Sequence, residues 1–175
     1  KCTATSRVIV EEGIYDEFVA ALVEATKKLK VGNGLETGVQ IGPAIDKSQL
    51  DTDLRYIEIA KKEGAKLECG GNHLTGGDYD KGFFVEPTVF TGVSEDMRIA
   101  QEEVFGPVLA VMKAKDYDDA IRIANNVAFG LSASIQTQDV SRIFEYASQI
   151  EAGLVTVNLP SAGVEYQLPF GGTKD

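Results

Sequence analysis

The chain has 175 residues, of which 43% are hydrophobic and 25% charged, the size and composition of one ordinary globular domain. It carries 27 Asp and Glu residues against 17 Lys and Arg, a formal net charge of −10, so its surface repels phosphate backbones and no nucleic-acid partner is expected. No stretch approaches the roughly 20 apolar residues that span a bilayer, so no membrane partner is expected either.

Segments rich in β-branched residues alternate along the chain with segments whose apolar residues recur at helical spacing. In chain order they predict a strand at residues 3–10, a helix at 14–29, a loop at 32–43, a helix at 47–63, strands at 65–69, 83–90 and 108–112, a helix at 116–126, a strand at 131–135, a helix at 139–150, a strand at 154–157 and a loop at 158–175.

Several residue types mark where these elements end. Gly64 is expected to end the second helix, and Asp116 and Asp139 to cap the two later helices. Pro87 lies within the predicted strand 83–90 and indicates an edge or an irregular start.

The alternation predicts an α/β fold with a mostly parallel sheet and helices on both faces, in one domain over residues 1–175. No G-x-G-x-x-G segment follows a strand and opens a helix. A dinucleotide-binding fold of the usual kind is therefore not expected within these residues.

The two cysteines are Cys2 and Cys69, and two thiols do not make a disulfide framework, so a reduced, cytoplasmic setting is expected. Cys2 lies beside the cation of Lys1, an environment that favours a nucleophilic thiolate. On local composition alone, the favoured alternative is a free cysteine exposed by truncation, since a free cysteine usually behaves as a small hydrophobe. Cys69 ends a short predicted strand and is expected to be a buried hydrophobe of that kind.

The segment Gln101–Val108 contains a second candidate site. Its Gly-Pro pair predicts a stiff turn that leads into a strand and fixes Glu103 and Phe105 at a sheet edge. A carboxylate accepts hydrogen bonds from both hydroxyls of a ribose, and a phenyl ring packs beside a nicotinamide. The alternative is a solvated acidic pair, Glu102 and Glu103, followed by a core phenylalanine.

Two further segments are bounded by glycine. In Pro169–Gly172, consecutive glycines allow a positive φ or a close approach of two backbones, and a tight turn is the simpler interpretation. His73, the only histidine, lies between two glycine pairs and is expected to be exposed in a loop. One histidine and two distant cysteines do not make a zinc site, so no metal is expected.

Lys-Cys-Thr-Ala-Thr-Ser-Arg at residues 1–7 resembles the nucleophile segment of the aldehyde dehydrogenase family. Gln-Glu-Glu-Val-Phe-Gly-Pro-Val at 101–108 is similar to that family's Glu-x-Phe-Gly-Pro motif, and Pro-Phe-Gly-Gly-Thr-Lys at 169–174 to its late Pro-Phe-Gly-Gly-x-Lys motif. Intermediate segments also match, in order, at residues 31–32, 41–43, 82–88, 125–133 and 153–158. The resemblance therefore extends over nearly the whole chain.

The resemblance implies an aldehyde dehydrogenase that depends on NAD or NADP and acts on a small-molecule aldehyde. Cys2 would be the nucleophile, attacking the aldehyde carbon to give a thiohemiacetal, and hydride transfer would then leave a thioester that water hydrolyses. Glu103 would hold the nicotinamide ribose, with Phe105 beside it. The full-length enzyme is expected to be a homo-oligomer.

Parts of the family pattern are absent from the 175 residues. In the family, the dinucleotide-binding domain and the glutamate general base mostly precede the cysteine, and a strand that joins subunits follows the last motif. We therefore expect a catalytic domain truncated at both ends, without its NAD-binding domain, which folds but does not oxidise aldehydes. Glu102 is not expected to replace the general base, because it belongs to the cofactor motif.

The loop Asn158–Tyr166 lies where the family lines its aldehyde tunnel, and it is similar to members that oxidise α-ketoglutaric semialdehyde. Two other functions are considered. One is a free-standing dehydrogenase-like domain that binds a partner without catalysis. The other is a cysteine hydrolase that uses Cys2 with His73, which no evident third orienting group supports.

Overall fold

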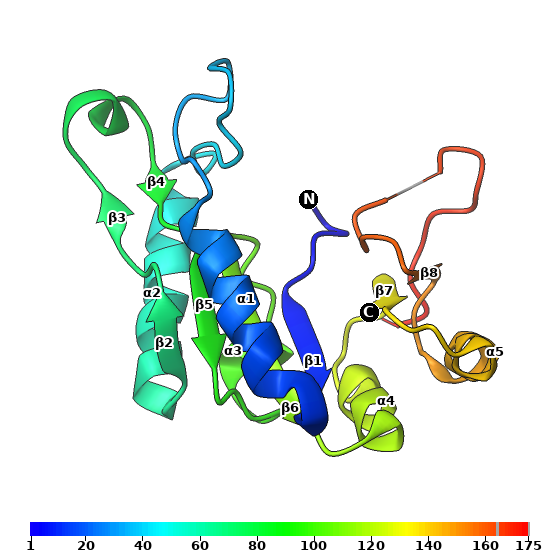
Figure 1. Ribbon diagram of the computed structural model, residues 1–175. Helices are drawn as coiled ribbons and strands as arrows, with labels where there is room; N and C mark the ends of the chain where they lie inside the picture. Colours follow the sequence, from blue (N-terminus) through cyan, green and yellow to red (C-terminus); the bar gives the residue numbers. More distant parts are fainter. Residues whose placement is uncertain (164, 175) are drawn as a thin grey trace. The chain divides into compact units, whose positions relative to one another are not determined.

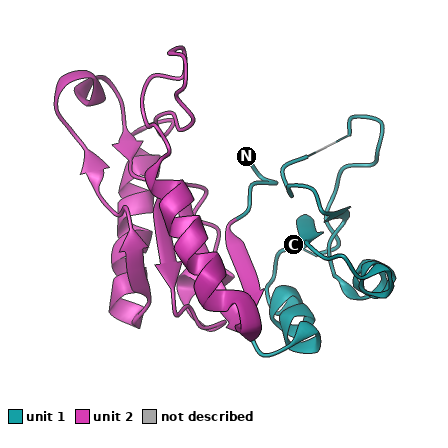
Figure 2. Cartoon of the chain, in the orientation of Figure 1, with its two compact units in different colours: residues 1–5, 114–175 teal, residues 6–113 magenta. Residues whose placement is uncertain are grey.

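The computed structural model describes residues 1–163 and 165–174 (Figure 1). The chain divides into two compact units. Unit 1 comprises Lys1–Thr5 and Ala114–Asp175, and unit 2 comprises Ser6–Lys113 (Figure 2). No helix within the described residues is long and apolar enough to cross a membrane.

Unit 2 is built around a four-stranded sheet with the strand order β1-β6-β5-β2. Its elements in chain order are β1 (Arg7–Glu11), the 3-10 turn η1 (Glu12–Ile14), α1 (Tyr15–Lys27), α2 (Lys47–Glu63), β2 (Lys66–Cys69), β3 (His73–Leu74), the 3-10 turn η2 (Gly77–Lys81), β4 (Phe84–Val85), β5 (Thr88–Thr91), α3 (Arg98–Gln101) and β6 (Val108–Ala114). Strands β5 and β6 run parallel, whereas β2 joins the edge of the sheet antiparallel to β5. Strands β3 and β4 form a separate antiparallel pair.

Helices cover both faces of this sheet. Strand β5 is buried at every residue, as expected of a strand that is covered on both sides. Figure 1 shows α1 in front of the sheet and α2 behind it. Under α1, the core contains Val10, Tyr15, Val89 and Val111, and each large apolar side chain removed from water contributes about 1.5–3 kcal/mol. The predicted α/β class with helices on both faces is confirmed.

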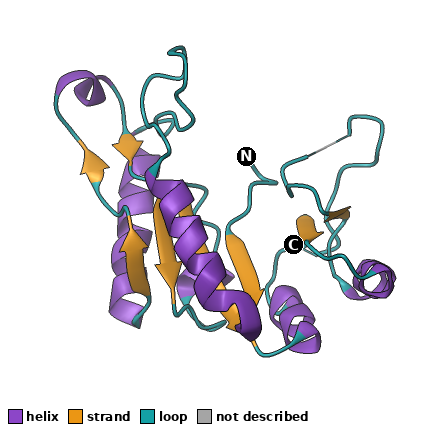
Figure 3. Cartoon of the chain, viewed as in Figure 1, coloured by secondary structure: helices purple, strands orange, loops and turns teal. Residues whose placement is uncertain are grey.

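In unit 1, a parallel strand pair is joined through a helix (Figure 3). Its elements are α4 (Tyr117–Asn125), β7 (Ser132–Ile135), α5 (Val140–Gln149) and β8 (Leu154–Val157). The two predicted caps are confirmed, because Asp116 accepts from the Asp119 N–H at 3.0 Å and Asp139 from the Ser141 N–H at 2.9 Å.

The bounds of α2 are as predicted, and Gly64 ends the helix at φ 98. The prediction for the first strand was wrong at its start, because residues 1–4 form a turn and the strand begins at Arg7. The predicted strand 83–90 is two strands, β4 and β5, separated at Pro87, which has no N–H to donate to a ladder.

Two short elements, β3 and α3, were not predicted, because two and four residues are too few to show a periodicity. His73 lies in β3, opposite Val85 of β4, so its predicted place in a loop was wrong. Its side chain is exposed, as expected.

Candidate active site

Cys2 lies in a tight turn at the start of unit 1. The Ala4 N–H donates to the carbonyl oxygen of Lys1 at 3.1 Å, which closes the turn. The Cys2 side chain is exposed, whereas the next residue, Thr3, is buried. The Cys2 N–H has no hydrogen-bond partner among the residues that the structure describes. The turn therefore offers a thiol and an N–H donor at one residue.

Ser161 fastens the Cys2 turn to the loop that begins at Asn158. The Ser161 hydroxyl donates to the carbonyl oxygen of Thr3 at 3.0 Å and lies 2.8 Å from the hydroxyl of Thr5. The carbonyl oxygen of Ser161 accepts from the Ser132 hydroxyl at 3.0 Å. Ser161 is 8% exposed, so these bonds are largely shielded from water. The loop expected to line an aldehyde tunnel thus lies against the Cys2 turn.

The same loop is held at its first residues. Asn158 adopts φ 54, a left-handed conformation that asparagine tolerates better than most residues. Its side-chain amide makes two hydrogen bonds to the backbone of Thr137, each 2.9 Å long. The Ser134 hydroxyl donates to the carbonyl oxygen of Leu159 at 2.6 Å. These bonds fix where the loop leaves β8.

The glycine pair near the C-terminus permits close contact between backbones. A Cβ on Gly153 would lie 1.9 Å from the carbonyl oxygen of Gly171, and one on Gly172 would lie 3.2 Å from that of Gly130. Neither Gly171 nor Gly172 has a positive φ. The glycines are therefore needed for close approach, and the predicted tight turn is wrong, because residues 169–172 form no turn.

Lys174, at the end of the same motif, contacts the last residue of α4 and the segment that follows it. Its ammonium donates to the carbonyl oxygens of Asn125 and Val127, at 2.5 Å and 3.1 Å, and pairs with Glu151 at 2.6 Å. Only 19% of the side chain is exposed. Lys174 thus holds the C-terminal segment against the end of α4, the helix end where the backbone dipole favours a cation.

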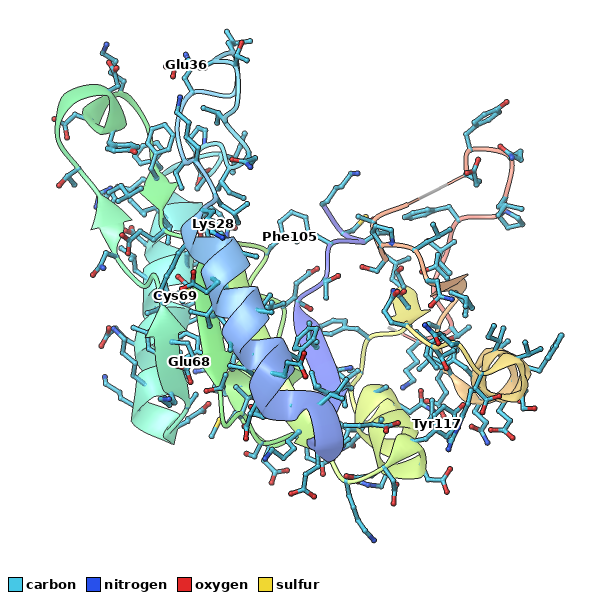
Figure 4. The ribbon with its side chains drawn as sticks, in the orientation of Figure 1. Lys28, Glu36, Glu68, Cys69, Phe105 and Tyr117 are labelled. Carbon is cyan, nitrogen blue, oxygen red and sulfur yellow. The ribbon has the colours of Figure 1, made fainter. Side chains whose placement is uncertain are left out.

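In unit 2, the turn at residues 102–107 alternates between anchored and exposed residues. Val104 is buried, whereas Glu103 and Phe105 are exposed. Phe105 is 56% exposed and adopts φ 61, a conformation that costs a non-glycine residue about 1–3 kcal/mol and persists only where its surroundings impose it. In Figure 4 its ring stands clear of the neighbouring ribbon. The alternative of a core phenylalanine is therefore wrong.

Glu102 anchors the beginning of this turn. Its carboxylate accepts two hydrogen bonds from Arg98, at 2.8 and 2.7 Å, and one from the hydroxyl of Tyr56. The bonds from Arg98, followed by that from Tyr56, lower the pKa of Glu102 to about 2. Glu102 is therefore an ionised structural residue, and only Glu103 remains as the free carboxylate of the acidic pair.

Residues 104–107 of the turn are held by two hydrogen bonds and one close contact. The Thr88 N–H donates to the carbonyl oxygen of Pro107 at 2.8 Å. The side-chain amide of Gln49 donates to the carbonyl oxygen of Val104 at 2.9 Å. A Cβ on Gly106 would lie 2.1 Å from Oδ1 of Asp53, so glycine is required at this position.

Cys69 has a different environment from Cys2. It is half-buried at the end of β2 and packs against the core under α1. Burial raises the pKa of the Cys69 thiol, which keeps it neutral and weakly nucleophilic. Among the described residues no group of histidine, cysteine and carboxylate side chains could hold a metal ion.

The structure thus brings together two sets of predicted residues. Within unit 1, the Cys2 turn meets the loop that starts at Asn158. Within unit 2, Glu103 and Phe105 share one anchored turn. Sequence reasoning missed the roles of Ser161 and Asp53. A single serine or aspartate leaves no local pattern in the sequence when its partner is distant along the chain, and Ser161 and Thr3 are 158 positions apart.

Comparison with known proteins places the chain in one family. The chain matches the aldehyde dehydrogenase family over residues 1–175. It is 51% identical over 174 residues to the alpha-ketoglutaric semialdehyde dehydrogenase of Bacillus subtilis (strain 168), a match that covers 99% of this chain and 36% of that protein. It is 49% identical over 174 residues to the 2,5-dioxopentanoate dehydrogenase of Saccharolobus solfataricus, covering 99% of this chain and 35% of that protein.

Solved structures agree with this assignment. The crystal structure of betaine aldehyde dehydrogenase from Staphylococcus aureus in complex with NAD+ matches with a TM-score of 0.93 and 36% identity, over 97% of this chain and 33% of that chain. The chain spans about a third of the length of the curated relatives that it matches. The chain belongs to the aldehyde dehydrogenase family.

Proposed function

We propose that the protein to which this chain belongs oxidises an aldehyde to a carboxylic acid with NAD or NADP, and that Cys2 is its nucleophile. One observation carries the proposal. In a chain of this family, the exposed thiol of Cys2 lies on a turn that Ser161 fastens to the expected aldehyde loop.

The chemistry begins at the Cys2 sulfur. As a thiolate, it adds to the aldehyde carbon, so that a C–S bond forms and the carbonyl oxygen takes the negative charge of a thiohemiacetal. The Cys2 N–H, which has no partner among the described residues, is available to donate to that oxygen. The aldehyde hydrogen then leaves with its electron pair, and a thioester remains on Cys2. Water breaks the C–S bond, releases the acid and restores the thiol.

The residues of the 102–107 turn fit a nicotinamide cofactor. Glu103 is an exposed carboxylate able to accept from both hydroxyls of a ribose, and Phe105 presents a flat ring on the same turn. Bound NAD or NADP would supply the hydride acceptor. The betaine aldehyde dehydrogenase structure, which contains NAD+, supports this role for the family.

The proposed enzyme also needs parts that residues 1–175 do not provide. We assign the dinucleotide-binding domain and the general base for thioester hydrolysis to that part of a longer protein, because the chain covers only about a third of its relatives. A cytoplasmic homo-oligomer is part of the same proposal, with residues 1–175 as its catalytic domain.

The proposed substrate is α-ketoglutaric semialdehyde, a short acidic aldehyde. Two relatives, at 51% and 49% identity, are named for this compound under two synonymous names. The loop Asn158–Tyr166 is the segment on which this specificity would depend; its residue Val164 lies outside the described residues, and its Ser161 donates to Thr3 beside Cys2.

Steady-state kinetics of the full-length protein test the proposal. With NAD or NADP, kcat/KM for α-ketoglutaric semialdehyde is expected to exceed that for benzaldehyde. Cys2→Ala is expected to abolish oxidation, while Cys69→Ala and His73→Ala retain it, because neither residue takes part in the chemistry. Full activity of Cys2→Ala would refute the nucleophile, and loss of activity in both Cys2→Ala and His73→Ala would favour a mechanism that uses cysteine and histidine together.

A further inference from the structure

Asp53 is an unusual residue for its place in the fold. It lies on the buried face of α2, together with Leu50, Ile57 and Ala60, and is 0% exposed. Its Oδ1 accepts from the side-chain amide of Gln49 at 2.7 Å, but its Oδ2 has no partner among the described residues. A buried carboxyl oxygen without a partner lowers stability. An apolar side chain would suit this position better, so the carboxyl points to a role other than stability.

The Asp53 carboxyl lies directly behind the 102–107 turn. The same Gln49 nitrogen that donates to Asp53 also donates to the carbonyl oxygen of Val104 at 2.9 Å. Both amide hydrogens of Gln49 are therefore engaged, which sets the orientation of its side chain. A Cβ on Gly106 would lie 2.1 Å from Asp53 Oδ1, so the backbone of the turn is in contact with the carboxyl as well.

These two contacts lie on either side of Phe105. Val104 precedes it and Gly106 follows it, and Phe105 itself holds φ 61 with an exposed ring. A strained backbone conformation persists only where its neighbours are fixed. Asp53 and Gln49 fix both neighbours, one through a hydrogen bond and the other through direct packing.

We propose that Asp53 is a positioning residue for cofactor binding. With Gln49 it forms a clamp that holds Val104 and Gly106, and so presents Phe105 and Glu103, on either side of Val104, in the conformation that receives the nicotinamide end of NAD or NADP. The inference rests on the proposed function for the identity of the ligand. The clamp itself rests on contacts within unit 2.

Three variants of the full-length protein test the clamp. Asp53→Ala removes the acceptor for Gln49, whereas Asp53→Asn keeps an oxygen in the same place. The control is Asp51→Asn on the same helix, because Asp51 is exposed and, among the described residues, forms an ion pair only with Lys47, at 2.6 Å. Asp53→Ala is expected to raise the KM for the cofactor about tenfold, because Gln49 loses its acceptor and Gly106 loses the side chain behind it. In Asp53→Asn and Asp51→Asn, the KM for the cofactor is expected to stay within about twofold of the wild-type value.

Two readouts separate positioning from folding. Hydrolysis of p-nitrophenyl acetate at Cys2 needs no hydride acceptor, so Asp53→Ala is expected to hydrolyse this ester at the wild-type rate. In the cofactor-free protein, hydrogen exchange at residues 103–106 is expected to be faster in Asp53→Ala, with a melting temperature equal to or above that of the wild type. A parallel loss of ester hydrolysis and melting temperature would overturn the proposal, since Asp53 would then be needed for folding.

Other outcomes are equally decisive. An unchanged cofactor KM together with unchanged exchange in Asp53→Ala would overturn the clamp, and so would an Asp53→Asn variant as impaired as Asp53→Ala. If the wild-type protein binds neither NAD nor NADP, the proposed function fails. Faster exchange of the turn in Asp53→Ala would still establish the clamp in that case.

Discussion

At the scale of single residues, the two cysteines differ in environment more than in sequence context. Cys2 is exposed on a turn whose closing hydrogen bond and buried Thr3 leave the thiol outward. Cys69 is half-buried against the core under α1, and burial raises its pKa. Because the thiolate is the reactive form, the two thiols are expected to react at different rates.

Alkylation measures this difference. With iodoacetamide at pH 7, the native protein is expected to be modified at Cys2 at least about tenfold faster than at Cys69, because the neutral, half-buried thiol is protected. Peptide mass spectrometry identifies the modified residue over a time course. Denatured protein, in which both thiols are exposed, is the control. Equal native rates would contradict the environments described here.

At the scale of elements, the 102–107 turn shows how packing presents two side chains. Glu102, Val104 and Gly106 are tied to α3, α2 and Asp53, and the two residues between them are left exposed. The anchor at Glu102 depends on its charge, because hydrogen bonds from Arg98 and Tyr56 lower its pKa from 4.5 to about 2.

The Glu102 anchor predicts a pH dependence of stability. A lowered pKa in the folded state means that Glu102 stabilises the fold above pH 4.5 and that this contribution is lost as the pH falls from 4.5 towards about 2. Urea unfolding of the wild type and Glu102→Gln is expected to differ at pH 7, and the difference is expected to shrink by pH 3. Because the carboxylate is 41% exposed, the difference at pH 7 is expected to be small. A difference that is constant with pH would argue against the anchor.

The C-terminal motif makes a second prediction at this scale. Gly153→Ala places a Cβ 1.9 Å from the carbonyl oxygen of Gly171, so the two backbones must separate. The substitution is expected to lower the free energy of unfolding by about 1–3 kcal/mol. Gly42→Ala is the matched control, because a Cβ there has nothing within 4 Å and its φ is not positive. Equal stability of the two variants, measured by urea denaturation, would show that the motif is not packed in this way.

At the scale of the whole molecule, the Cys2 turn belongs to unit 1 and the 102–107 turn to unit 2. It spans about a third of the length of its relatives. The proposed mechanism also needs a dinucleotide-binding domain and a general base, which we assign to the remaining length of a longer protein.

A turnover assay on residues 1–175 tests that division. With NAD and a simple aldehyde, the chain by itself is expected to produce no NADH above the blank, while circular dichroism reports a folded α/β protein. The full-length protein, assayed in parallel, is the positive control. Clear turnover by residues 1–175 alone would show that the general base and the main cofactor contacts are already present within them.

The sequence by itself determined the class of fold, the bounds of α2, the caps at Asp116 and Asp139, and the family, because these depend on neighbours within a few residues or on motifs in order. It also singled out Cys2, Glu103 and Phe105 as candidates, with their roles still to be tested. Only the tertiary structure decided that Phe105 is exposed, that Ser161 fastens the Cys2 turn and that Asp53 lies against Gly106. Those facts join residues up to 158 positions apart, and contacts of that range are made by packing, which no local pattern records.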